Sequence, residues 1–301
     1  MALKGKFSIF LLEWRQHMPD QLKFGITSMN MGATSYPDAL VRVAQAAETA
    51  GFDSLWAGEH SVLAESSERI PATSRILNPL VALTFVAAHT RTVHLGTGIL
   101  LLPQHHPLIL AKELASLDVL SGGRLIVGIG VGWAEAEFEA LGVPYHERGA
   151  RAVEYLAAMR AIWSEEKPVY HGQYIAFQGV QAYPHPVQQP APPIVIGGRA
   201  PAVIRRTVEQ ANGWYGFALD LDETANLLAD LREAAQRYHR PASLGELEIS
   251  VAPRIPIDKE TAQRFAELGV HRLILIPPWG KDASALEQWV TTLGETLVGQ
   301  V

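Results

Sequence analysis

The residues best suited to proton transfer lie in the segment Trp56-Ala57-Gly58-Glu59-His60, at the end of a short apolar stretch. A histidine in such a place can donate or accept a proton near pH 7, which makes His60 the candidate catalytic residue. A histidine that only hydrogen-bonds to its own loop would give the same pattern. His105 and His106 also stand together, but adjacent histidines point in different directions and no carboxylate is close in sequence. We therefore predict no metal site.

Three glycine-rich segments could bring a ligand close to the backbone. Gly96-Thr97-Gly98-Ile99 lies in an apolar stretch, where paired glycines indicate a bulge, a close approach of another group, or simple packing. Gly128-Ile129-Gly130-Val131-Gly132-Trp133 lacks the final glycine of a dinucleotide-binding fingerprint. In Ile196-Gly197-Gly198-Arg199-Ala200 a strand runs through two glycines into a helix, so free amides and a helix N-terminus predict a phosphate site, to which Arg199 adds charge. A plain tight turn is the alternative.

The elements that must position these residues alternate between strand and helix from Lys23 onward. Strands are predicted over 23–29, 54–57, 93–101, 125–129, 194–196, 213–217, 247–251 and 273–276, separated by helix-length segments such as 37–50, 79–88, 107–120, 200–210 and 224–238. Continuous apolar strands are typical of a parallel sheet buried on both faces. Eight consecutive units, with no phosphate fingerprint opening the first, favour a (β/α)₈ TIM barrel over a doubly wound open sheet.

The predicted organisation is one domain over 23–301, with an insertion at about 131–192 after the fourth strand. A loop that long is usually functional, and in a barrel it lies at the C-terminal face, where active sites are built. Within it we predict a helix over 147–163, a small hairpin over 170–174 and an extended segment over 184–193. Residues 1–22 are expected to be a weakly ordered leader or an over-long start of the reading frame.

Composition excludes several classes of protein. The 301 residues are 48% apolar, which is enough for a substantial core, and they carry a formal net charge of −6 without long runs of one sign. This is not the electrostatic pattern of a nucleic-acid-binding protein. There is no cysteine, hence no disulfide and no thiolate ligand or nucleophile, which is compatible with a cytoplasmic location. No apolar segment is long enough to predict a membrane span.

Taken together, these segments resemble the luciferase-like monooxygenase superfamily, and within it the deazaflavin (coenzyme F420)-dependent oxidoreductases. The similarity spans residues 23 to about 280, and the combination of motifs is specific although each motif alone is not. The matching segments begin with 46–56 and continue with Glu59-His60, Leu95-Gly96-Thr97-Gly98-Ile99, the helix 111–118, Ser121-Gly122-Gly123-Arg124-Leu125, Gly128–Trp133, Arg148 and 193–198.

The resemblance implies a TIM barrel whose C-terminal face binds the tricyclic ring, with the ribityl phosphate held by Gly197 and Gly198. It also places Glu59 and His60 at the ring, a non-prolyl cis peptide between Gly98 and Ile99 behind it, and Val131 and Gly132 along its other edge. The cofactor-binding residues expected on this basis are Glu59, Thr97, Gly98, Ile99, Val131, Gly132, Gly197, Gly198, Arg199 and Ala200.

One departure from the family pattern bears on the chemistry. In sugar-phosphate dehydrogenases of this branch, a catalytic glutamate follows the glycine that matches Gly132, whereas this chain has Trp133. Their tryptophan four residues after the histidine corresponds to Ala64 here. The chain therefore does not resemble a sugar-phosphate dehydrogenase, and the proton donor stays open between His60, Glu59 and groups of the insertion.

The resemblance leads to three functional hypotheses. The first is a deazaflavin-dependent oxidoreductase that transfers hydride to or from a small organic substrate, with Arg199, Arg205 and Arg206 binding the anionic tail of the deazaflavin. The second is an FMN-dependent monooxygenase of the same fold, and the third a flavin-binding protein without catalysis, in which Trp133 fills the pocket. We expect a homodimer.

Overall fold

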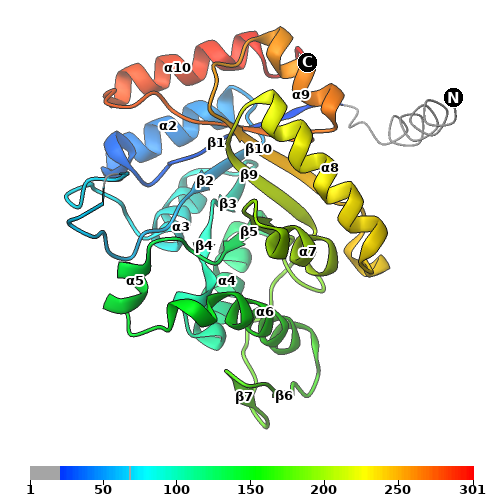
Figure 1. Cartoon of the computed structure of the whole chain (residues 1–301). Coiled ribbons are helices and arrows are strands. Elements are labelled where there is room, and N and C mark those ends of the chain that lie inside the picture. Colours follow the sequence, from blue (N-terminus) through cyan, green and yellow to red (C-terminus); the bar gives the residue numbers. More distant parts are fainter. Residues whose placement is uncertain (1–20, 68) are drawn as a thin grey trace, which may run out of the picture.

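The computed structural model describes residues 21–67 and 69–301, and its centre is a closed barrel of parallel strands surrounded by helices (Figure 1). The strands pair in chain order, and Ile26 of the first strand lies beside Leu55 on one side and Leu275 of the last strand on the other. This confirms the predicted (β/α)₈ TIM barrel. The eight barrel strands are β1 (Lys23–Ile26), β2 (Ser54–Ala57), β3 (His94–Thr97), β5 (Leu125–Gly130), β8 (Ile194–Gly197), β9 (Gly213–Leu219), β10 (Glu248–Pro253) and β11 (Arg272–Leu275).

The third strand differs from its prediction. An unbroken strand over 93–101 was expected, but β3 ends at Thr97, and a separate short strand, β4 (Leu100–Leu101), follows it. The peptide bond between Gly98 and Ile99 is cis, as the resemblance predicts, and it turns the chain between the two strands. Both strands pair with β5, β3 near its start and β4 near its end.

Helices begin and end at the residues expected from capping. Proline occupies the first turn of four helices and aspartate caps three others through its side chain. Gly122 and Gly269 end two helices in the left-handed conformation that glycine adopts without cost. The helices that follow the strands are α2 (Pro37–Thr49), α3 (Pro79–His89), α4 (Pro107–Ser121), α7 (Pro201–Gln210), α8 (Leu221–Arg237), α9 (Lys259–Leu268) and α10 (Ala283–Thr296).

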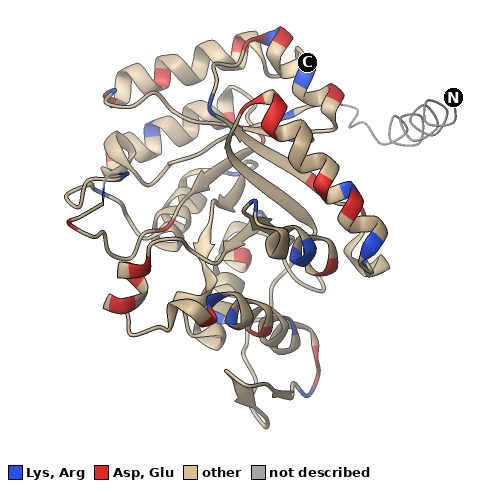
Figure 2. Ribbon diagram, in the orientation of Figure 1, with Lys and Arg blue, Asp and Glu red and all other residues tan. Residues whose placement is uncertain are grey.

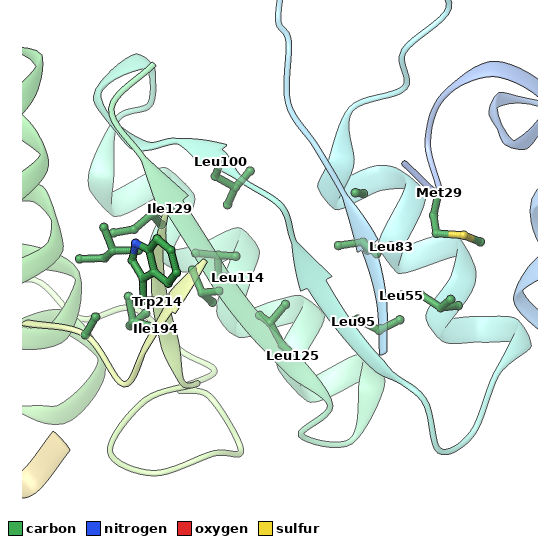
Figure 3. Packing of buried hydrophobic residues seen from close by; sticks show 14 of the residues in the cluster. Met29, Leu55, Leu83, Leu95, Leu100, Leu114, Leu125, Ile129, Ile194 and Trp214 are labelled. Atoms are coloured by element: carbon green, nitrogen blue, oxygen red, sulfur yellow. The ribbon is translucent and has the colours of Figure 1, made fainter. Parts of the chain in front are cut away.

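Buried side chains form two layers, because successive residues of a strand point to opposite faces of the sheet. Leu55, Leu125 and Ile194 point outward from the barrel and pack against the helices. Figure 3 shows them in one layer with Leu83 of α3 and Leu114 of α4. Their neighbours along the strands belong to the smaller cluster inside the barrel, which consists of Trp56, Ile126, Val195, Tyr215, Ala252 and Ile274, with Ile99 packed against it. Burial on both faces explains why the strands are apolar throughout.

The segment between β5 and β8 contains the predicted helix and hairpin, as α6 (Arg148–Ser164), β6 (Tyr170–His171) and β7 (Ala176–Phe177). Helix α6 buries Leu156, Met159 and Trp163 and packs against α4, so it takes the place of the outer helix of the fourth βα unit. The additional helix α5 (Glu135–Ala140) was not predicted. Most of the predicted leader, residues 1–20, lies outside the described residues, while Leu22 is buried in the core.

Charged residues are confined to one end of the barrel strands. Figure 2 shows Lys, Arg, Asp and Glu mainly on the helices, with both signs interspersed along α8. Within the barrel strands they occur only at first positions, as Lys23, Glu248 and Arg272. The Arg272 side chain is 2% exposed; its Nε donates to Asp53 Oδ2 at 2.7 Å and another guanidinium nitrogen pairs with Glu248. The N-terminal end of the barrel is thus closed by a charge network.

Candidate active site

At the C-terminal end, half of the barrel mouth is lined by glycine. The glycine half, as it is called here, consists of Gly98, which directly follows β3, and of Gly130 and Gly197, the last residues of the neighbouring strands β5 and β8. A Cβ at Gly130 would lie 2.0 Å from Cδ1 of Ile99, and one at Gly197 would lie 3.1 Å from its Cγ2. The Ile99 side chain therefore lies directly over the backbone of β5 and β8, where a larger residue than glycine would displace it.

Two stacked aromatic rings form the floor beneath this mouth. Trp56 and Tyr215 are parallel within 1°, with centroids 5.6 Å apart, and a Cβ at Gly96 would lie 2.2 Å from the indole. The Tyr215 hydroxyl is fully buried and has no hydrogen bond of good geometry among the described residues, although Thr27 lies close to it. Burial raises the pKa of this hydroxyl above its usual value. It is a buried polar group of the floor, beneath the mouth and beside Thr27.

His60 is paired with a carboxylate that sequence reasoning missed. Its Nδ1 lies 2.6 Å from Oε1 of Glu137 on α5, and the two side chains are 13% and 2% exposed. Gln104 donates to the other oxygen of Glu137 at 3.3 Å. Because Nδ1 faces Glu137, Nε2 is the nitrogen left for a substrate. The partners are 77 residues apart in sequence, and α5 was itself not predicted, so no local signal joined them.

Glu59 is also paired with a histidine, but it points away from His60. The Leu101 N–H donates to Oε2 of Glu59 at 2.6 Å, and Nε2 of His105 lies 3.0 Å from both carboxylate oxygens. Burial alone would lower the pKa of His105, but the hydrogen bond and charge of Glu59 outweigh it and raise that pKa above its usual 6.5. Glu59 therefore ties β4 and the start of α4 to the β2 loop. The carboxylate partner that His105 lacks in the local sequence is supplied by the fold.

The phosphate turn predicted at Gly197 to Ala200 leads into α7 as expected. Gly198 has a φ of +134°, which favours glycine, and Trp214 donates to its carbonyl at 2.9 Å. Ala200 is the N-cap of α7 and provides no side-chain hydrogen bond. Pro201 has no N–H and the Val203 N–H donates to the Ala200 carbonyl at 2.8 Å, so the Ala202 N–H is the amide of the first turn that is left for an anion. This geometry suits a phosphate group.

The arginines expected to bind a cofactor tail are not gathered into one patch. Arg199 donates to the carbonyls of Phe217 and Ala218 at 2.6 and 3.2 Å, and Arg205 pairs with Glu209. Arg206 is 8% exposed and donates to a backbone carbonyl of α6. Arg199 precedes α7, and helix geometry points Arg205 and Arg206 in different directions. A shared tail site stays a prediction that this arrangement does not favour.

Comparison with known proteins identifies the family. Residues 19–295 match the model of the luciferase-like monooxygenases. The chain belongs to this family. The F420-dependent hydroxymycolic acid dehydrogenase of Mycobacterium tuberculosis is 31% identical over 83% of this chain and 65% of its own. The oxygenase component of the flavin-dependent trigonelline monooxygenase of Acinetobacter baylyi is 31% identical over 67% and 54%. The crystal structure of the monooxygenase RslO1 from Streptomyces bottropensis has a TM-score of 0.75 at 24% identity, over 92% of this chain and 99% of that one.

In this luciferase-like barrel, the other residues expected to bind the cofactor differ in whether they are free to contact a ligand. The Thr97 hydroxyl is buried and exchanges hydrogen bonds of 2.7 Å with the backbone of Gly128, so it is used within the sheet. Gly132 has a φ of +77°, and a Cβ there would lie 2.8 Å from the Phe138 ring. Val131 packs against the core. The structure thus brings His60, Gly98, Ile99 and Gly197 to Ala200 to one mouth and gives Thr97 and Glu59 internal partners.

A bound flavin or deazaflavin fits the residues that line this luciferase-like mouth. The glycine half has no side chains of its own and is covered by Ile99, and the N-terminus of α7, which lacks a side-chain cap, suits a phosphate. Within residues 21–67 and 69–301 no three His, Asp or Glu side chains are grouped as a metal site would require. In the same part of the chain, no helix has both the length and the apolar character needed to cross a bilayer.

Proposed function

We propose that this protein is a deazaflavin-dependent oxidoreductase that transfers hydride between coenzyme F420 and a small organic substrate. The observation that carries the proposal is the His60–Glu137 pair beside a glycine-lined mouth, with an open helix N-terminus on the same face of the barrel. Hydride transfer to or from an alcohol or ketone requires a proton at the oxygen, and a paired histidine can hold or release it.

Each part of the mouth has a distinct task in this proposal. The turn Gly197 to Ala200 and the free N–H of Ala202 at the start of α7 bind the phosphate, and Ile99 with the glycine half supports the ring. Once bound, the deazaflavin supplies two-electron hydride chemistry. His60 exchanges a proton with the substrate oxygen at Nε2. The buried carboxylate of Glu137 orients the imidazole.

The second candidate is an FMN-dependent monooxygenase. One observation in its favour is the similarity to the trigonelline monooxygenase, a flavin-dependent relative whose match covers two thirds of this chain. Another is that Arg199, Arg205 and Arg206 do not form a shared patch for the deazaflavin tail. The phosphate turn and the glycine half would accept either cofactor. The longer coverage by the F420-dependent relative supports the first candidate.

The test is an equilibrium titration of the purified protein with F420 and with FMN, followed by the fluorescence of each cofactor. The proposal predicts tighter binding of F420. Comparable affinity, or a preference for FMN, would contradict it and favour the monooxygenase.

We also propose that the protein is a homodimer joined through α3 and α4, which pack against each other. Val81, Ile109 and Leu120 on these helices are 67%, 60% and 68% exposed. Such an apolar surface is typical of a contact between subunits. Sedimentation velocity should show a dimer for the natural chain and a monomer for Leu120→Glu, and a monomeric natural chain would contradict this part of the proposal.

A further inference from the structure

The half of the mouth opposite the glycine half is apolar. Phe217 lies two residues beyond Tyr215 on β9, and its ring centroid is 6.3 Å from that of Tyr215, so it continues the interior face of the strand upward. Ile276 stands in the same relation to Ile274 of the interior cluster. Phe217 is 51% and Ile276 37% exposed. Two large apolar side chains therefore face the space above the floor.

Trp133 adds a third apolar surface next to the candidate catalytic histidine. It is 47% exposed, and its ring lies edge-on to His60 with centroids 6.2 Å apart. Arg69 of the β2 loop lies over the indole, 4.5 Å from its centroid, which holds the tryptophan in place. The position that carries a glutamate in the resembling sugar-phosphate dehydrogenases is thus an aromatic wall beside His60.

Three arginines at this end of the barrel, Arg199, Arg254 and Arg69, already have partners. Arg199 donates to two backbone carbonyls, and Arg254 pairs with Asp220 and Glu223. Arg69 is stacked on Trp133 and exposed to solvent, where screening weakens its attraction for an anion. The free amide at the start of α7 is taken by the cofactor phosphate in the proposed function. None of these groups is left as a clamp for a phosphate or carboxylate of the substrate.

We infer that the substrate is an uncharged, mainly apolar alcohol or ketone, and that Trp133 and Phe217 determine this specificity. The inference rests on the proposed function, because it takes the cofactor to occupy the glycine half and the phosphate turn. The two aromatic side chains bury the hydrocarbon part of the substrate and leave its oxygen at His60. A charged group in the same position would lose water without gaining a partner.

The test compares two ligands that share a ring and a ketone, a methylcyclohexanone and the cyclohexanone carboxylate substituted at the same position. Binding to the F420-loaded protein is followed by ligand-observed NMR. We expect the neutral ketone to bind at least about tenfold more tightly, because the carboxylate would be desolvated without a counter-charge. Equal affinity, tighter binding of the carboxylate, or binding of neither ketone would overturn the inference.

Variants assign the preference to the aromatic walls. Trp133→Ala and Phe217→Ala should each weaken the neutral ketone about tenfold, the scale of one lost aromatic contact, and leave F420 affinity nearly unchanged. Val187→Ala is the control, because Val187 is 55% exposed but lies near Gly123 at the other end of the barrel. Unaltered ketone binding in both aromatic variants would contradict their role. Since the readout is binding, it stays valid even if hydride transfer itself is not found.

Discussion

At the N-terminal end of the barrel Arg272 joins Asp53, Glu248 and Ser250, whereas at the C-terminal end His60 has one carboxylate partner and borders a glycine-lined mouth. The first network satisfies its own charges and ties β2, β10 and β11 together. The second leaves a histidine nitrogen and a helix N-terminus for a ligand. The residues at the N-terminal ends of the strands thus stabilise the fold, and those at the C-terminal ends form the candidate active site, as is general for this fold.

The largest effect is expected at His60. His60→Gln should lower turnover by about 10²–10⁴-fold, the usual contribution of a positioned acid or base, with cofactor affinity nearly unchanged. Turnover is measured with an alcohol or ketone that the natural protein converts, and His89→Gln on the outside of the barrel is the control. Full activity in the His60 variant would show that this histidine is only a residue of the rim.

At the N-terminal end of the barrel, a substitution should lower stability and leave cofactor binding unchanged. Arg272→Met should lower the free energy of unfolding by about 2–3 kcal/mol, because it leaves Asp53 and Glu248 without their partner, and should not change F420 affinity. Urea unfolding measures the first and titration the second. Arg42→Met, which removes an exposed pair with Glu287, should have a far smaller effect on stability. A loss of F420 affinity in Arg272→Met would contradict the division between the two ends.

The same network sets a dependence of stability on pH. Burial raises the pKa of Asp53, but the charge and hydrogen bond of Arg272 outweigh this and hold it below the usual 3.8. A carboxyl group with a lowered pKa stabilises the fold above its unfolded value and loses that contribution as pH falls through the folded one. The natural protein should therefore lose stability below about pH 4 more steeply than Arg272→Met. If the stability of the two proteins fell in parallel as pH is lowered, the Asp53–Arg272 ion pair would not be the cause of the pH dependence.

A smaller loss of turnover is expected for Glu137→Gln, which keeps the shape of the side chain but removes its charge. A reduction of about 10–100-fold is typical when a carboxylate that orients a histidine is lost. The loss should appear in kcat, with F420 affinity nearly unchanged, whereas a purely structural role would also weaken cofactor binding. The double variant with His60→Gln should be no slower than His60→Gln alone.

The smallest effect concerns Glu59 and His105. The raised pKa of His105 means that the pair stabilises the fold fully below pH 6.5 and progressively less as pH rises through the folded pKa. His105→Gln should cost about 1 kcal/mol of stability at pH 6 and less at pH 9, with turnover little changed. Equal losses at both pH values would contradict a charged pair.

These sites also show what can be predicted from the sequence. The barrel and the turn from β8 into α7 were predictable, because apolar periodicity and glycine positions are local. The cis peptide at Gly98 followed from the resemblance. That the turn binds a phosphate stays a prediction. The partner of His60 was not, because Glu137 lies 77 residues away on a short helix without a strong periodic pattern. For the same reason Glu59 was assigned to the ring, while its partner His105 is 46 residues distant. Such pairs join side chains of different loops, and they become visible only once the barrel has brought those loops together.

The most direct measurement of the proposed cofactor site uses Ala200, the exposed N-cap of α7. Aspartate and asparagine are both good N-caps, so Ala200→Asp and Ala200→Asn should each leave the barrel at least as stable. Only the aspartate puts a negative charge where the phosphate binds, and it should weaken F420 by at least about 100-fold relative to the asparagine variant. Equal F420 affinity in the two variants would contradict the assignment of the phosphate, and with it the cofactor, to this end of the barrel.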